Sequence, residues 1–152
     1  MEKNKRDEYF IIAEILACIS FILHTICVVT AERGGSFAPA WITNFNAIYW
    51  LKTVSAIIGF YCFFISGVFN TKDISRYISI STLIILLYSL PIINTVFLFI
   101  FAIIFKIIRG STFEYEDRIL IQTIWFIPLI FIIGDLCTNL SKKRKNNYNG
   151  HR

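Results

Sequence analysis

Charge is scarce in this chain. Only 16% of its 152 residues are Asp, Glu, Lys or Arg, whereas 56% are hydrophobic. A soluble domain typically carries about a quarter charged residues. No polar segment here is long enough to bury a hydrophobic core of its own in water. The composition therefore excludes an ordinary soluble domain and predicts a single membrane domain covering residues 1–152.

The residues that most enzymes and metal sites need are also rare. The chain has two histidines, and it has no paired-histidine helix motif, phosphate-binding glycine loop or nucleophile-elbow serine. Its four cysteines form no C-x-x-C pair, and all fall in apolar stretches, where small packing residues are expected: Cys18, Cys27, Cys62 and Cys137. We therefore predict a non-enzymatic protein that holds neither a metal nor a cofactor.

Four apolar runs are long enough to cross a membrane, and we predict spans over residues 9–30, 47–69, 77–105 and 119–140. The third run has no formal charge and would reach ~43 Å as one helix, more than the ~30 Å hydrocarbon core. Pro91 lies at its middle, so a re-entrant hairpin is the alternative to a kinked full crossing. The predicted fold is an all-α membrane bundle of four helices with a proline-kinked third span.

Basic residues favour four spans, because cytoplasmic segments carry an excess of Lys and Arg. With the N-terminus inside, the larger basic set is cytosolic: Lys3, Lys5, Arg6, Lys72, Arg76, Lys142, Lys143, Arg144, Lys145 and Arg152. The outer set is smaller: Arg33, Lys106, Arg109 and Arg118. A hairpin would leave three spans and place the basic tail, 141–152, outside. We therefore predict that both termini are cytosolic and that the protein lies in a bacterial inner membrane.

The ends and loops are short. The tail residues Lys142, Lys143, Arg144 and Lys145 are expected to lie on the anionic lipid surface and not on nucleic acid. The outer loop 31–46 carries aromatic side chains that suit a short interfacial helix or a partner-docking surface, and the charges of the loop 106–118 cancel. The first run could also be a cleaved signal peptide, but it is longer and more polar than such a sequence, so we predict a retained helix.

Small residues gather on one face of the first two spans at helical spacing. These are Ala13, Ala17 and Ser20 in the first span, and Ser55, Gly59, Cys62 and Ser66 in the second. Small side chains let helix backbones approach closely, which favours helix association in lipid. We expect both faces to pack against other helices.

Five polar side chains within the spans are the candidate functional residues: Glu14, His24, Lys52, Asn94 and Asp135. In the predicted topology Glu14 and Asp135 lie at similar depth near the cytosolic surface. If they face each other, two carboxylates in a low dielectric would resist double ionisation and could hold a proton. The alternative is that each carboxylate reaches water or the lysines of the tail.

The other three polar candidates lie farther from the cytosol. His24 and Lys52 fall near the outer surface, where Lys52 is expected to snorkel to the rim and His24 to hydrogen-bond a neighbouring helix. Asn94, about one turn past the proline, is expected to bond a neighbouring helix or the backbone that the kink loosens. We interpret all three as structural unless the site holds water.

No stretch carries a specific family motif. The gross plan, a small, basic, four-span protein with short loops, resembles the immunity proteins that protect bacteria from pore-forming bacteriocins. That resemblance covers layout only, and it implies a protein that binds another membrane-embedded protein, such as a toxin. Two other functions fit the same polar residues: an oligomeric membrane-permeabilising effector of a toxin or anti-phage system, and a proton-coupled carrier or accessory subunit.

Overall fold

The computed structural model describes residues 3–30, 47–68, 76–110 and 115–149, which form helices and contain no strand. The helices are α1 (Lys3–Thr30), α3 (Ala47–Ser66), α4 (Arg76–Ser89), α5 (Pro91–Arg109), α6 (Tyr115–Ile124) and α7 (Phe126–Asn149). Four segments are long and apolar enough to cross a membrane: Lys5–Val29, Ala47–Ser66, Pro91–Arg109 and Ile119–Ser141. The predicted all-α class is confirmed, and the four segments indicate an integral membrane protein. The loop 31–46 lies outside the described residues.

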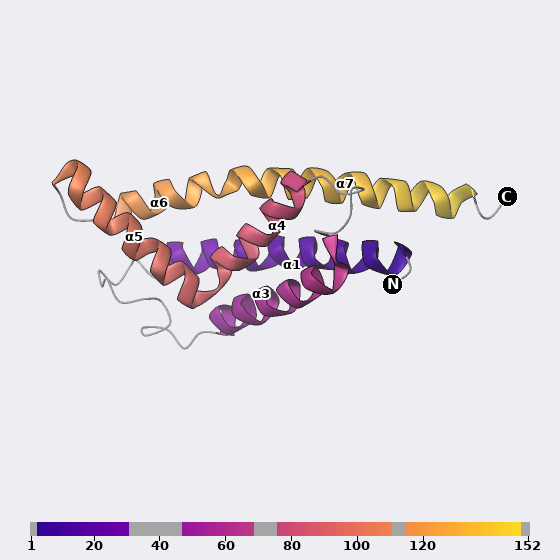
Figure 1. The fold of residues 1–152 in the computed structure, drawn as a ribbon, viewed down its shortest axis with the longest axis horizontal. Helices are drawn as coiled ribbons and strands as arrows, with labels where there is room; N and C mark the ends of the chain where they lie inside the picture. Colours follow the sequence, from indigo (N-terminus) through magenta and orange to yellow (C-terminus); the bar gives the residue numbers. More distant parts are fainter. Residues whose placement is uncertain (1–2, 31–46, 69–75, 111–114, 150–152) are drawn as a thin grey trace.

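Helix α1 is the central element of the bundle. It packs along α3 for much of its length and also contacts α4 and α7, so α3 and α7 flank it in Figure 1. Helix α5 makes its main contact with α4, diverges from α3 and reaches the start of α6 at its far end (Figure 1). The start of α1 and the end of α7 lie at the same end of the molecule (Figure 1).

The third predicted span consists of two helices in the structure. Helix α4 ends at Ser89, Leu90 is extended with φ −76° and ψ 132°, and Pro91 begins α5. A proline disfavours the helical conformation of the residue before it, which accounts for the extended Leu90. The proline itself suits the first turn of a helix, because its missing N–H would have had no partner there. The Asn94 N–H donates to the Leu90 carbonyl oxygen at 2.9 Å and starts the new helix.

A second proline breaks the last predicted span. Pro128 has no N–H to donate to the carbonyl of Ile124, and its ring crowds that carbonyl. The chain accordingly turns at Trp125, between the end of α6 and the start of α7. Helix α7 then continues to Asn149, well beyond the predicted end at residue 140, because Lys and Arg are good helix formers.

Glycines in the left-handed conformation end two helices. Gly67 has φ +59° and follows Ser66, the last residue of α3. Gly110 has φ +68°, and its N–H donates to the Lys106 carbonyl oxygen at 3.0 Å. Glycine adopts this conformation without the steric cost that other residues meet. Lys106 and Arg109 lie in the last turn of α5, where cations suit the helix dipole, so this helix runs past the predicted end at residue 105.

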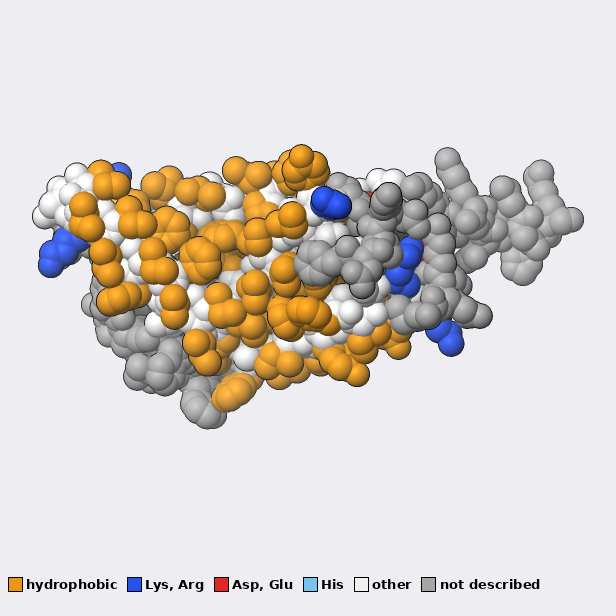
Figure 2. Space-filling model, in the orientation of Figure 1, with side chains coloured by type: hydrophobic (Ala, Val, Ile, Leu, Met, Phe, Trp, Pro, Cys, Tyr) orange, Lys and Arg blue, Asp and Glu red, His pale blue; other side chains and the backbone are white. Residues whose placement is uncertain are grey.

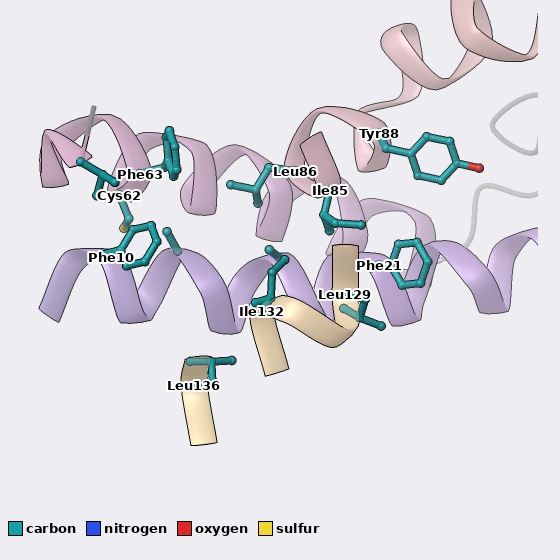
Figure 3. Packing of buried hydrophobic residues seen from close by; sticks show 13 residues of the cluster. Phe10, Phe21, Cys62, Phe63, Ile85, Leu86, Tyr88, Leu129, Ile132 and Leu136 are labelled. Atoms are coloured by element: carbon teal, nitrogen blue, oxygen red, sulfur yellow. The ribbon is translucent and has the colours of Figure 1, made fainter. Parts of the chain in front are cut away.

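The hydrophobic core lies where α1 meets α3, α4 and α7. Figure 3 shows Phe10 of α1 beside Phe63 of α3, and the two ring centroids are 6.2 Å apart. Ile132 approaches α1 from α7, on the side opposite α3 (Figure 3). The cluster also contains Ala13, Ala17, Phe21, Cys62, Val68, Ile85, Leu86, Tyr88, Leu129 and Leu136.

Both small-residue faces point into this core. Ala13, Ala17 and Ser20 of α1 are fully buried. The small residues of α3 are buried as well: Ser55, Gly59, Cys62 and Ser66. An added Cβ at Gly59 would lie 2.7 Å from Leu86 Cδ2, 3.1 Å from Leu16 Cβ and 3.7 Å from the Ala13 carbonyl oxygen. The absence of a side chain at Gly59 is therefore what lets α1, α3 and α4 meet at one point.

The outer surface is apolar. Figure 2 shows one face covered by hydrophobic side chains, with the visible Lys and Arg side chains mainly near its ends. On α1 the exposed side chains are the isoleucines Ile12, Ile15, Ile19, Ile22 and Ile26, as lipid contact requires. Helix α5 is the least buried of the four spans, because Asn94 is its one buried residue and the others are half-buried or exposed.

Candidate functional site

His24 of α1 is the centre of a buried polar cluster. Its side chain is 3% exposed and lies between Lys52 of α3 and Asn94 of α5. The Lys52 Nζ atom is 3.4 Å from His24 Nδ1, and the Asn94 Nδ2 atom is 3.3 Å from His24 Nε2. The structure thus brings together three of the five polar candidates, and they join three helices.

Hydrogen-bond chemistry fixes how His24 must be protonated in this cluster. The Lys52 amine donates, so Nδ1 has to accept and the ring proton has to sit on Nε2. The Nε2–H group then needs an acceptor. Asn94 supplies one when its side-chain amide is rotated by half a turn, so that Oδ1 faces the ring in place of Nδ2. The two ends of the amide have the same shape, so this rotation needs no extra space. A neutral imidazole therefore satisfies both of its neighbours.

Lys52 lies inside the molecule and not at its rim. Its side chain is 3% exposed, and Nζ sits 4.7 Å from the centre of the Tyr49 ring. The expected snorkelling of Lys52 to the outer surface is therefore not the conformation adopted. An imidazole acceptor and an aromatic face together replace part of the hydration that the amine loses. Within the described ranges no carboxylate forms a salt bridge with Lys52.

Two further hydrogen bonds extend the cluster to Tyr88, Gln122 and Thr25. The Tyr88 O–H donates to Gln122 Oε1 at 3.0 Å, and the Gln122 Nε2–H donates to Thr25 Oγ1 at 2.7 Å. The Tyr88 ring meets His24 edge-on, with centroids 4.9 Å apart, and stacks on Trp125 at 4.5 Å. The polar cluster, defined as His24, Lys52, Asn94, Tyr88, Gln122 and Thr25, thus connects α1, α3, α4, α5 and α6.

A serine pair adds one more link between α1 and α4. The Ser20 hydroxyl lies 3.2 Å from the Ser89 hydroxyl, and Ser89 donates to the Ile85 carbonyl oxygen at 2.9 Å. The Ser20 hydroxyl also lies 3.0 Å from the Ala17 carbonyl oxygen of its own helix, so its single proton is shared between that carbonyl and Ser89. Both serines are fully buried. The last turn of α4 is therefore held to α1 just before the helix breaks.

Glu14 of α1 and Asp135 of α7 form a second site, and Glu14 lies ten residues before His24 along α1. Glu14 is fully buried, and Asp135 of α7 interacts with it electrostatically. Asp135 is half-buried and accepts a hydrogen bond from the Asn139 amide nitrogen at 2.8 Å. The structure thus brings the two predicted carboxyl groups together across the α1–α7 contact. The side chains of Lys142, Lys143, Arg144 and Lys145, the alternative partners, lie outside the described part.

Neither site has the ligands of a metal centre. Across the described ranges, no three His, Cys, Asp or Glu side chains lie close enough to hold a metal ion. The four cysteines are free thiols. At the far end of α5, Arg109 Nη1 donates to Asp117 Oδ1 at 2.9 Å, which joins α5 to α6. The polar groups of the structure therefore serve mainly to connect helices.

An apolar pocket of about 460 Å³ separates α3 from α5. It opens to the outside beside the polar cluster, because α5 diverges from α3 after the break at Leu90. Its lining comes from the first turns of the two helices: Tyr49, Trp50 and Thr53 of α3, and Pro91, Ile92, Thr95 and Val96 of α5. No sequence pattern indicated this pocket, since it depends on the angle between the two helices.

The residues that sequence analysis missed are Tyr88, Gln122 and Thr25. Gln122 gave a usable signal, because an amide within an apolar run needs a partner in lipid. Tyr88 lies three residues before Pro91 and gave a weaker signal.

Comparisons with known protein families, with curated proteins and with solved structures found no match to this chain.

Proposed function

We propose that this chain is a non-enzymatic membrane protein that works by binding another membrane-embedded protein, with α5 as its contact helix. The observation that carries the proposal is the exposure of α5, which has the length and hydropathy of a span but buries only Asn94. In lipid, helices associate through close packing and interhelical hydrogen bonds. A spanning helix with so few contacts in its own chain keeps nearly all of that packing surface for a partner.

The pocket between α3 and α5 supplies a place for a partner side chain. Ile92 is 80% exposed at one wall, and Trp50 stands half-exposed at the other. Interfaces gain most of their binding energy where a bulky apolar side chain fills such a pocket. The partner that fits is a transmembrane helix with a large aliphatic or aromatic side chain at the depth of Pro91.

The small-residue faces of α1 and α3 do not bind the partner in this proposal. Ser55 and Gly59 lie against α1 and α4, inside the chain. Bulky substitutions there would disturb the bundle itself, and so they would not separate partner binding from folding. The outer faces of α5 and of the pocket are the surfaces on which binding can be tested without changing the core.

The proposal includes an orientation. We take α4 and α5 as one crossing, so that the four crossings leave both termini on the cytosolic side of a bacterial inner membrane. The excess of basic residues at the termini supports this orientation, and so does the position of the start of α1 and the end of α7 at one end of the bundle (Figure 1). A cytosolic reporter fused to the C-terminus should be active, and a periplasmic reporter fused there should be silent.

An immunity role is the form of this proposal that agrees with the layout. A toxin that acts in the membrane would present the apolar helix that α5 is suited to bind. The permeabilising effector is less well supported, because it needs Glu14, Asp135, His24 or Lys52 on an axis shared by several subunits, and Asp135 is half-buried while the other three are buried. In the structure these three side chains are between 0% and 3% exposed within a single chain.

Site-specific photo-crosslinking tests the proposal in the cells that produce the chain. A photoreactive amino acid replaces Phe99 of α5, which is 67% exposed, and in a matched control it replaces Ile22 of α1, which is 54% exposed. We expect a protein adduct from position 99 and lipid adducts alone from position 22. The pocket-filling variant Thr95→Trp should reduce the adduct, whereas Thr123→Trp, at an exposed position of α6, should not.

Two results would count against the proposal. Equal adducts from positions 99 and 22 would mean that α5 has no special role. An adduct formed only between two copies of this chain would replace partner binding with self-association, and it would favour the oligomeric effector.

A further inference from the structure

The carboxyl group of Glu14 stands apart from the other buried polar groups. In the described ranges, its Oε1 and Oε2 atoms are the only buried side-chain polar atoms that lack a hydrogen-bond partner. The residue has no exposed surface and is surrounded on α1 by the buried Phe10, Ala13 and Ala17. An ionised carboxylate without hydrogen bonds in such surroundings is strongly disfavoured. The side chain therefore requires a ligand that neutralises it.

We propose that Glu14 and Asp135 form a proton-binding site, in which Glu14 carries the proton and donates its O–H to the carboxylate of Asp135. One proton then serves two carboxyl groups, and a single negative charge remains on the pair. Asn139 donates to Asp135 Oδ2 at 2.8 Å, which stabilises the charge there and leaves Oδ1 to accept from Glu14. When the proton leaves, it passes from the Glu14 O–H to water by way of the half-buried Asp135.

The groups that face Glu14 favour a proton over a metal cation. From α7 the charged neighbour is Asp135, and from α1 itself the titratable neighbour is the thiol of Cys18. Toward this part of α1, α3 presents Gly59 and α4 presents Leu86, neither of which is charged. A sodium or calcium ion needs about six oxygen ligands, whereas among the described residues no third carboxylate, histidine or cysteine joins the pair closely enough to hold a metal ion. A proton needs only the two carboxyl groups.

The site would couple protonation to the α1–α7 contact. With the proton bound, a hydrogen bond joins the two helices. Without it, two negative charges face each other at low dielectric and push α7 away from α1. This role is independent of the binding of a partner by α5, since the two sites lie on different helices.

Infrared spectroscopy of the full chain in lipid nanodiscs tests the proposal directly. At neutral pH the wild type should show the C=O absorption of a protonated carboxylic acid, and Glu14→Gln should abolish it. Gln has the shape of protonated Glu and keeps a donor, so the variant is expected to fold. Glu8→Gln, at an exposed position of the same helix, should leave the absorption unchanged. Asp135→Asn should shift its frequency, because the acceptor for the Glu14 proton changes.

Several results would overturn the proposal. A wild-type spectrum without this absorption at neutral pH would show that Glu14 is ionised. An absorption that keeps its frequency in Asp135→Asn would show that the two groups do not share a proton, and this measurement holds even if Glu14→Gln fails to fold. Loss of the absorption when sodium is added at constant pH would make the pair a cation site.

Discussion

Gly59 shows at the scale of one residue how closely the helices approach. A methyl group there would lie 2.7 Å from Leu86 Cδ2 and 3.1 Å from Leu16 Cβ. The leucine tip of α4 can turn aside, but a Cβ atom can move only with its helix. The small-residue pattern on α3 predicted a close contact of this kind. It did not predict that the contact would be within the chain.

Gly59→Ala should therefore destabilise the bundle by about 1–3 kcal/mol, the usual cost of overpacking a core. The measurement is the thermal unfolding midpoint of the purified protein in detergent. Gly134→Ala is the matched control, because nothing lies within 4 Å of the added methyl group and alanine is the better helix former. This control should be neutral, or should stabilise by up to about 1 kcal/mol. Equal midpoints for the two variants would contradict the packing described here.

The bond between His24 and Asn94 can be measured by a double-mutant cycle. Substituting both residues with alanine, singly and together, should give a coupling free energy of about 0.6 kcal/mol, and at most about 1.7 kcal/mol, the range found for hydrogen bonds between transmembrane helices. Reversible unfolding in mixed detergent supplies the four stabilities. His24 paired with the exposed Thr95 is the control cycle and should show no coupling. No coupling between His24 and Asn94 would mean that the observed 3.3 Å contact is not an effective bond.

Sequence predicted the polar residues better than it predicted their partners. Any ionisable or amide side chain in an apolar run is a candidate, because lipid offers it no hydrogen bonds. The partners depend on the rotation of each helix and on the break at Leu90, which turns Asn94 of α5 toward His24. Lys52 was expected at the rim because a long amine can usually reach water. His24 and the Tyr49 ring give it partners inside the bundle.

At the scale of the helices, hydrophobic length and the positions of glycine and proline carried most of the information. The four apolar runs all correspond to helices, and Gly67 and Gly110 mark two helix ends. Prolines break two of the runs: Pro91 at the preceding residue, Leu90, and Pro128 at Trp125, three residues before it. Sequence could place both prolines near the middle of the membrane. It could not give the angle between the helices on either side, because that angle depends on the packing of α4 against α1 and α7.

Pro91→Ala should straighten the junction of α4 and α5. Alanine lets Leu90 adopt the helical conformation and restores a backbone donor, so the two helices can continue as one. Spin labels at two exposed positions, Tyr77 of α4 and Ile108 of α5, report the change by pulsed electron resonance in a variant without the native cysteines. The distance should lengthen toward the ~46 Å of a continuous helix of this length. An unchanged distance would mean that tertiary packing, and not the proline, sets the bend.

At the scale of the whole molecule, polar and apolar side chains occupy different places. The polar cluster and the carboxyl pair lie between helices of one chain, and the outer surface is left apolar (Figure 2). Sequence predicted an apolar exterior for every span. It could not show which span would pack least, because the apolar segments of α5 and α1 have nearly the same mean hydropathy, and the exposure of α5 follows from its divergence at Leu90. The proposed partner site therefore emerged only from the three-dimensional arrangement.

The central claim is that the polar side chains bind one another inside the chain, so that the protein acts by binding and not by conducting ions. The most direct measurement is the membrane potential, followed with a voltage-sensitive dye in bacteria that make this chain alone. Its abundance in the membrane fraction is verified in the same cells. We predict an unchanged potential and normal growth, because Glu14, His24 and Lys52 are buried within one chain and do not face a surface that could line a pore between subunits. Depolarisation with growth arrest would contradict the account and would make the same side chains the lining of a pore.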